Sequence, residues 1–132
     1  MPSRRRVLFV CPHGAAKSPM AAAWFNGAQV PGWSASSAAG VEPQAAVSQN
    51  AVRLLAGTPV QSLLEHTAPR PMSEVPAADL VVAIDCGGAV AGAVQWQLTH
   101  QQFDAAMGDE VRDLVLALAA EVSNEVSNAE RP

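Results

Sequence analysis

The 132 residues fit one domain of ordinary size, and a hydrophobic share of 49% is enough to form a core, which excludes global disorder. A net charge of −4 gives no electrostatic reason to expect a nucleic acid or an anionic membrane as partner. No run of about 18 apolar residues is present that would span a membrane. Two cysteines without a secretion signal indicate a reducing cytoplasm, and the scattered histidines indicate no metal site.

The chain begins with a predicted strand, a tight loop and a helix. Residues 7–10, VLFV, are apolar throughout, as strands buried in a parallel sheet are. A loop of small residues follows from Cys11. Ser18 and Pro19 then precede an Ala-rich run, and we expect a helix over about 19–28 because Ser is a preferred N-cap and Pro suits the first helical position.

The middle of the chain predicts four further elements around a long irregular segment. Residues 33–38 predict a strand of poor propensity, and residues 48–56 a helix that Ser48 caps. Residues 58–76 contain four prolines and are expected to be irregular with short ordered pieces. Residues 78–84 are apolar except for Asp79 and, after residues 7–10, are the clearest strand of the chain. Residues 93–98 alternate between apolar and polar and predict a further strand near an edge of the sheet.

The last predicted helix carries its apolar residues on one stripe at helical spacing. They are Val111, Leu114, Val115, Leu118, Val122 and Val126. Strands that alternate with helices in this way predict an α/β fold with a parallel sheet. We expect a single domain over residues 1–132, with flexible ends at 1–6 and 127–132.

The loop after the first strand has the features of an anion site with a nucleophile. A loop that leads into a helix presents unpaired backbone N–H groups and the positive end of the helix dipole, which favour a tetrahedral oxyanion. The same field stabilises a thiolate, so Cys11 is a candidate nucleophile. Lys17 adds a positive charge, and Gly14 can adopt the positive φ that such a loop needs. The alternative is a buried structural cysteine.

Cys11, followed by five residues and then Lys17-Ser18, resembles the C-x5-R-S loop of the low-molecular-weight protein tyrosine phosphatases and of their relatives, the thiol-coupled arsenate reductases. The place of this loop, behind a VLFV strand and before a Ser-Pro-Met-Ala helix, strengthens the likeness. Residues 39–43, AGVEP, resemble the reductase branch, and 79–82, DLVV, resemble the third strand of the family. The resemblance implies a three-layer α/β sandwich whose four-stranded parallel sheet has the order 2-1-3-4, with helices on both faces.

The resemblance also implies a covalent mechanism in which the Cys11 thiolate attacks phosphorus or arsenic. Residue 17 would neutralise charge on the oxyanion, and the Ser18 hydroxyl would donate to the Cys11 sulfur. The residues that would surround the oxyanion belong to one loop. They are Pro12, His13, Gly14, Ala15, Ala16, Lys17 and Ser18.

Three departures from the family pattern bear on activity. Lys17 replaces an arginine, and an ammonium group is a point charge where a guanidinium is a bidentate fork. The Asp-Pro pair that supplies the general acid, worth about 100- to 10,000-fold, is missing. His100 is a candidate substitute, although a surface loop role is the commoner one for such a residue. Asp85 is a second candidate, for which we favour a turn or cap role.

The third departure is that no cysteine lies inside the loop beside Cys11. Cys86 is then the only possible resolving thiol, and its alternative role is that of a buried cysteine in a Gly-rich turn. A single-cysteine mechanism with an external low-molecular-weight thiol, as in the arsenate–mycothiol transferases that the chain also resembles, stays open beside a Cys11–Cys86 relay.

These features predict a cysteine-nucleophile enzyme for a tetrahedral oxyanion. We favour a thiol-dependent arsenate reductase, an oxidoreductase, because of residues 41–43, Cys86 and the missing acid. It would hold no bound cofactor and would use thioredoxin or a low-molecular-weight thiol such as mycothiol as external reductant. The alternatives are a hydrolase, namely a phosphatase for phosphotyrosine or a small phosphomonoester, and a catalytically impaired anion-binding module.

Overall fold

The computed structural model describes residues 5–129, which form a four-stranded parallel sheet in the order β2-β1-β3-β4. The strands are β1 (Arg5–Cys11), β2 (Trp33–Ala39), β3 (Leu80–Ile84) and β4 (Val94–Trp96). The α-helices are α1 (Lys17–Gly27), α2 (Gln49–Leu55) and α3 (Ala105–Ala129), and the short 3-10 helices are η1 (Gln61–Leu63) and η2 (Met72–Glu74). The predicted α/β fold and the predicted strand order are therefore confirmed.

Strand β1 occupies the centre of the sheet because its residues are apolar on both faces. Val7 and Phe9 belong to the larger core on one face, whereas Leu8 and Val10 belong to a smaller core on the other. Both neighbouring strands run parallel to β1 and pair with it in register. A strand that is hydrophobic on both faces gains most from this central position.

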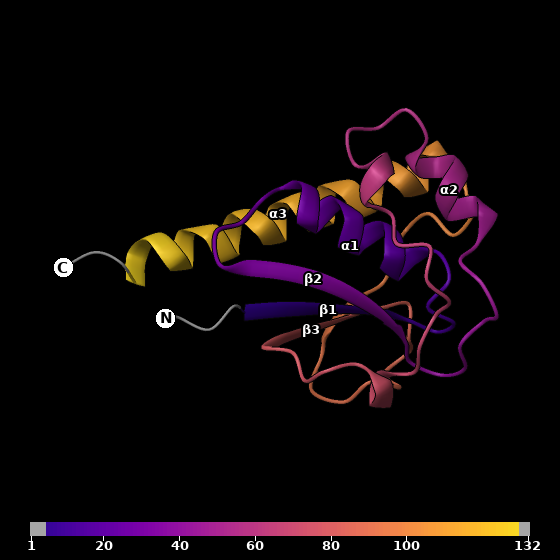
Figure 1. Ribbon diagram of the computed structural model, residues 1–132, viewed down its shortest axis with the longest axis horizontal. Coiled ribbons are helices and arrows are strands. Elements are labelled where there is room, and N and C mark those ends of the chain that lie inside the picture. Colours follow the sequence, from indigo (N-terminus) through magenta and orange to yellow (C-terminus); the bar gives the residue numbers. More distant parts are fainter. Residues whose placement is uncertain (1–4, 130–132) are drawn as a thin grey trace.

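The two faces of the sheet are covered by different structures. Helices α1 and α3 lie together on one face, where they pack against each other and α1 packs on β1 and β2 (Figure 1). On the opposite face, Met72 and Val75 in and beside η2 cover the smaller core together with Val90. The layers are thus unequal, with α-helices on one face and a 3-10 helix and loops on the other.

Residues 5 and 6 and residues 127–129 belong to regular elements. Arg5 and Arg6, which we expected to be flexible, are part of β1, and the Arg5 amide donates to the Gly32 carbonyl at 2.8 Å. Residues 127–129, also expected to be flexible, belong to α3. Residues 1–4 and 130–132 of that prediction lie outside the described residues.

Helix α3 buries the predicted stripe against the larger core. Val111, Val115 and Val122 are buried, and Leu114 and Leu118 are half-buried. The side chain of Val126 lies outside the described part. Within residues 5–129, no helix combines the length and apolar composition needed to cross a membrane.

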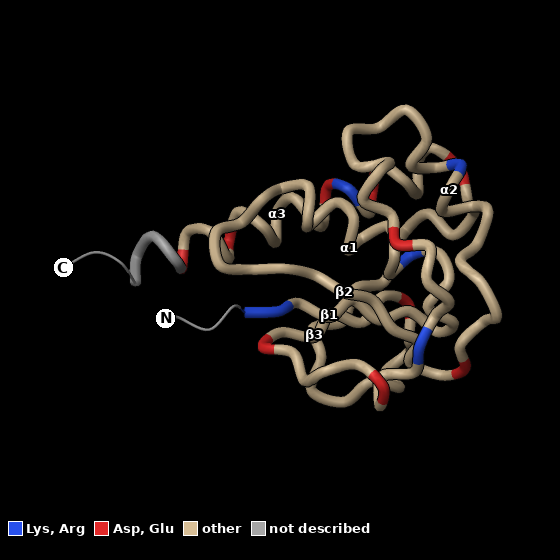
Figure 2. The backbone as a smooth tube through the Cα atoms, viewed as in Figure 1, with Lys and Arg blue, Asp and Glu red and all other residues tan. Residues whose placement is uncertain are grey.

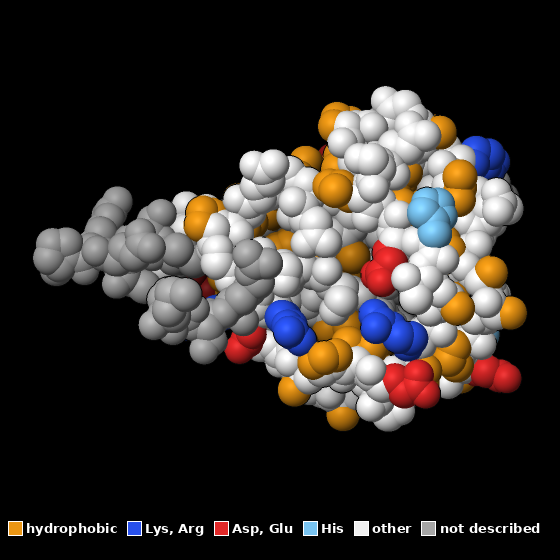
Figure 3. All heavy atoms as spheres, in the orientation of Figure 1, with side chains coloured by type: hydrophobic (Ala, Val, Ile, Leu, Met, Phe, Trp, Pro, Cys, Tyr) orange, Lys and Arg blue, Asp and Glu red, His pale blue; other side chains and the backbone are white. Residues whose placement is uncertain are grey.

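Charged residues are sparse and stand mostly at isolated positions along the chain (Figure 2). On the face seen in Figure 3, acidic and basic side chains lie interspersed, and hydrophobic side chains form small separate areas between polar ones. This face therefore presents no continuous charged or apolar patch.

The Asn26 side chain joins α1 to β2, and its removal should destabilise the fold. Its Nδ2 donates to the Ala35 carbonyl at 3.1 Å, and its Oδ1 accepts from the Ala35 amide at 2.8 Å. We expect Asn26→Ala to lower the free energy of unfolding by about 1–3 kcal/mol, because two half-buried backbone groups lose their partners. Chemical denaturation measures this. Asn124→Ala, at an exposed position of α3, is the matched control, and an equal loss in both variants would contradict the prediction.

Candidate active site

Cys11 is the last residue of β1, at the carboxyl end of the central strand. Strand β2 lies on one side of β1 and β3 on the other, so the chain leaves β1 toward one side and later returns on the opposite side. In open parallel sheets this arrangement leaves a crevice at the carboxyl end of the strand, where ligands bind. The topology thus places the candidate nucleophile at the usual position of a binding site.

Ser18 is in direct contact with the Cys11 sulfur. Its Oγ lies 3.1 Å from Cys11 Sγ, and its amide donates to the same sulfur at 3.4 Å. The predicted N-cap role of Ser18 is wrong, since α1 begins at Lys17 with Ala16 as its N-cap and without a side-chain cap. The physical reason is that the fully buried Ser18 hydroxyl contacts Cys11 and the Ala38 carbonyl instead of a helix amide.

The loop between β1 and α1 has amides without partners. Among the hydrogen bonds of residues 5–129, none is donated by an amide of residues 13–17. The loop carbonyls, in contrast, accept from the segment 41–48. The bonds are Val41 N to Pro12 O at 3.0 Å, Gln44 N to His13 O at 3.1 Å and Ser48 N to Ala15 O at 2.8 Å. Three loop carbonyls are therefore occupied, while five consecutive amides remain available for an anion.

Gly14 is required for this loop conformation. Its φ is +65°, and a Cβ at this position would lie 2.9 Å from the Ala39 amide nitrogen at the end of β2. Both observations exclude a larger residue without a shift of backbone. The prediction of a positive φ at Gly14 is confirmed.

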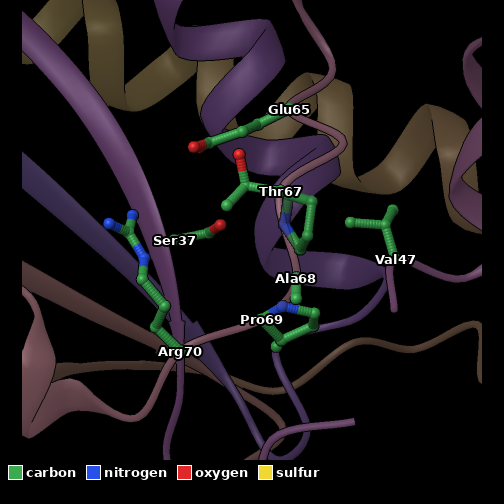
Figure 4. A pocket seen from close by; sticks show the side chains of 9 residues that line it. Ser37, Val47, Glu65, Thr67, Ala68, Pro69 and Arg70 are labelled. Carbon is green, nitrogen blue, oxygen red and sulfur yellow. The ribbon is translucent and has the colours of Figure 1, made fainter. Parts of the chain in front are cut away.

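Gly14 also lines a small recess that is separate from the Cys11 pocket. Figure 4 shows the hydroxyls of Ser37 and Thr67 and the carboxylate of Glu65 turned toward the same space, with Arg70 beside them. Its volume is about 10 Å³, which is about the space that a single water molecule needs. This recess is too small for an oxyanion and does not include Cys11.

The pocket that contains Cys11 is larger, about 250 Å³. Loop residues and Lys17 line one part of it, Asn50 of α2 lines another, and Phe103 forms an apolar wall. Arg53 connects the last two residues through hydrogen bonds. Its Nη2 donates to Asn50 Oδ1 at 2.9 Å and to the Phe103 carbonyl at 2.7 Å. No site role was predicted for Asn50, Arg53 or Phe103, because these residues meet only through the fold.

Lys17 is paired with Asp85. Lys17 Nζ donates to Asp85 Oδ2 at 2.7 Å, and the side chains are only 15% and 11% exposed. Asp85 Oδ1 also accepts from the Leu98 amide at 2.9 Å, and Gln101 Nε2 donates to Oδ2 at 3.3 Å. Asp85 thus connects the Cys11 loop to the segment after β4. These contacts agree with the favoured turn role of Asp85.

Several solved structures are similar to this fold over most of their length. An arsenate reductase from Archaeoglobus fulgidus is 30% identical, with a TM-score of 0.67 over 86% of this chain and 98% of that one. A low-molecular-weight protein tyrosine phosphatase from T. tengcongensis is 25% identical, with a TM-score of 0.69 over 89% and 99%. An arginine phosphatase from Geobacillus stearothermophilus, at 20% identity, has a TM-score of 0.72 over 97% and 99%. No family model and no curated protein matches the sequence.

The similarity to the arsenate reductase extends over nearly the whole length of that enzyme. At 30% identity, it indicates a common family and not only a common fold. The chain belongs to the superfamily of low-molecular-weight protein tyrosine phosphatases and arsenate reductases.

Cys86, the candidate resolving thiol, is buried. Its thiol donates to the carbonyls of Val10 and Ile84, each at 3.6 Å. Burial, and then the negative charge of a Cys11 thiolate, raises the pKa of Cys86. Both cysteines are free, and Cys86 does not line the Cys11 pocket.

His100, the candidate acid, is held at the N-terminal part of α3 and does not line the Cys11 pocket. Its ring Nδ1 lies 3.0 Å from Glu110 Oε1, and half of the His100 side chain is exposed. The Glu110 carboxylate also accepts from the amides of Thr99 and His100 at 2.8 and 2.9 Å. An acid role for His100 stays a prediction that this arrangement does not favour.

Glu110 should make stability depend on pH in acid. Burial opposes its ionisation, but the hydrogen bonds from Thr99 and His100 outweigh burial and lower the pKa of Glu110 from 4.5 to about 2. A lowered pKa means that its stabilisation is complete above pH 4.5 and is lost as the pH falls to about 2. We expect Glu110→Gln to flatten the fall of unfolding free energy across this window, as measured by urea denaturation. Glu121→Gln, at an exposed position, is the control, and identical slopes for wild type and Glu110→Gln would contradict the prediction.

Proposed function

We propose that this protein is a thiol-dependent arsenate reductase in which Cys11 attacks the oxyanion. The observation that carries the proposal is the combination of the Cys11 sulfur, its contact with Ser18 at 3.1 Å, and five loop amides without partners among the described residues. Amides that face a developing charge stabilise it without reorganisation. The 30% identity to an arsenate reductase supports this branch of the superfamily.

The proposed reaction begins with attack of the Cys11 thiolate on As(V), which forms an S–As bond and releases one arsenate oxygen as water after protonation. The loop amides of residues 13–17 hold the remaining oxygens, and the Ser18 hydroxyl donates to the thiolate before attack. A second thiol then attacks the Cys11 sulfur. The S–As electron pair stays with arsenic, which leaves as arsenite, and the two sulfurs form a disulfide. Oxidation of two thiols balances the two-electron reduction of As(V) to As(III).

We propose that the second thiol comes from an external low-molecular-weight compound rather than from Cys86. Cys86 is buried, its thiol donates to two carbonyls, and its raised pKa keeps it protonated. A protonated thiol is a poor nucleophile. The pocket above Cys11, at about 250 Å³, leaves room for a small thiol beside the oxyanion.

A phosphatase is the second candidate, favoured by the shape of the same pocket. Phe103 provides an apolar wall, and the volume exceeds that of a bare oxyanion. An aromatic wall suits a phosphomonoester with an apolar leaving group. Because the chain has no Asp-Pro acid, hydrolysis would depend on a leaving group that needs little protonation.

The arsenate assay tests the first candidate. We expect wild type to form arsenite from arsenate and a low-molecular-weight thiol, Cys11→Ser to lose at least about a thousandfold in kcat/KM, and Cys86→Ser to retain most of the activity. Arsenite formation and the mass of a Cys11–thiol disulfide are the readouts. Loss of activity in Cys86→Ser, with the fold intact, would indicate an internal relay instead.

The phosphatase is tested with an activated aryl phosphate. If it applies, kcat/KM falls at least about a thousandfold in Cys11→Ser, whereas His100→Ala changes it little because the leaving group needs no acid. Activity that persists in Cys11→Ser comes from a contaminant. If the protein binds phosphate but turns over neither substrate, the result would favour the third alternative, a catalytically impaired anion-binding module.

A further inference from the structure

We propose that Asp85 sets the affinity of the site for its oxyanion by competing with the oxyanion for the ammonium group of Lys17. This inference rests on the proposed function only in requiring that the Cys11 loop binds an oxyanion. The ion pair at 2.7 Å is largely buried, so solvent screens it less than a surface pair. An anion in the Cys11 pocket therefore meets a lysine whose charge is already neutralised.

The ion pair stands between two pockets. Lys17 lines the Cys11 pocket, whereas Asp85 lines a neighbouring pocket of about 630 Å³ together with Cys86 and Gln101. The contact between Nζ and Oδ2 therefore joins a residue of one pocket to a residue of the other. Movement of Lys17 toward an anion would break this contact.

Asp85 is the fixed partner of the pair. Its carboxylate accepts from the Leu98 amide at 2.9 Å, its own amide donates to the Trp96 carbonyl at 2.8 Å, and its φ is +55°. The backbone of Asp85 is thus bonded to the last residue of β4, and its carboxylate to the segment after β4. Lys17 has a flexible four-carbon stem, so Lys17 is the group that moves.

Competition has a direct consequence for affinity. When Lys17 moves to an oxyanion in the pocket, its charge-assisted hydrogen bond to Asp85 is lost. A bond of similar strength, from Lys17 to the oxyanion, takes its place. The net gain from Lys17 is then small, and the loop amides supply most of the affinity. Removing the Asp85 charge should release Lys17 and tighten anion binding.

The test is calorimetric titration of the full chain with inorganic phosphate. We expect Asp85→Asn to tighten the Kd for phosphate about tenfold, since one charge-assisted competitor is lost. Asparagine retains an oxygen for the Leu98 amide, which protects the fold. In a Lys17→Met background, Asp85→Asn should change the Kd by less than about twofold, because no ammonium group is left to release. Glu65→Gln, at an exposed position near the loop, is the charge-matched control and should leave Kd unchanged.

A second variant tests the same competition without removing the carboxylate. Gln101→Ala removes one of the two donors to Asp85 Oδ2. The remaining hydrogen bond, from Lys17 to this oxygen, should then become stronger. We expect weaker phosphate binding in this variant. Tighter binding in Gln101→Ala would overturn the proposal even if Asp85→Asn failed to fold.

The other outcomes separate this inference from the proposed function. If wild type binds phosphate and Asp85→Asn does not bind it more tightly, the competition is overturned while the oxyanion loop stands. If the gain persists in the Lys17→Met background, Asp85 acts by repulsion alone and the competition is again overturned. If neither wild type nor folded Asp85→Asn binds phosphate, the oxyanion loop itself is overturned, and this inference with it.

Discussion

Burial of β1 on both faces is the constraint on which the site depends. Val7 and Phe9 face one core and Leu8 and Val10 the other, so the strand must run through the middle of the sheet. Its last residue, Cys11, then lies between the carboxyl ends of β2 and β3, and the loop that follows has to turn sharply into α1. Gly14 permits that turn because it adopts a positive φ and approaches the Ala39 amide where a side chain would collide.

The electrostatics of the site follow from the hydrogen bonds and the ion pair that the surrounding segments make with the loop. Segment 41–48 occupies the loop carbonyls, which leaves the amides of 13–17 for a ligand. Ser18 gives its hydroxyl to the Cys11 sulfur instead of capping α1. Asp85 holds Lys17, so the positive charge that the loop carries in the sequence is offset in the structure. The amides, more than the lysine, therefore give this site its preference for anions.

Local patterns predicted much of the fold. The apolar runs at β1 and β3, the Ser48 cap and the stripe of α3 are each determined by near neighbours, and the structure has them close to the predicted bounds. The ends were less predictable. Arg5 and Arg6 are polar, yet they belong to β1 because the Gly32 carbonyl and the register with β2 extend the strand. The start of α1 was misplaced because the contact with Cys11 outweighed the capping preference of Ser18.

By itself, the sequence determined that a nucleophilic cysteine lies between a buried strand and a helix, with a glycine and a lysine in the loop, because these features depend on spacing along the chain. Only the tertiary structure decided what the lysine contacts, since Asp85 lies 68 positions away and meets Lys17 through the pairing of β1 with β3. It also decided that Phe103 and Asn50 form the walls of the Cys11 pocket, through Arg53. Contacts between residues remote in sequence carry no local signal, because they arise from packing of elements rather than from propensity.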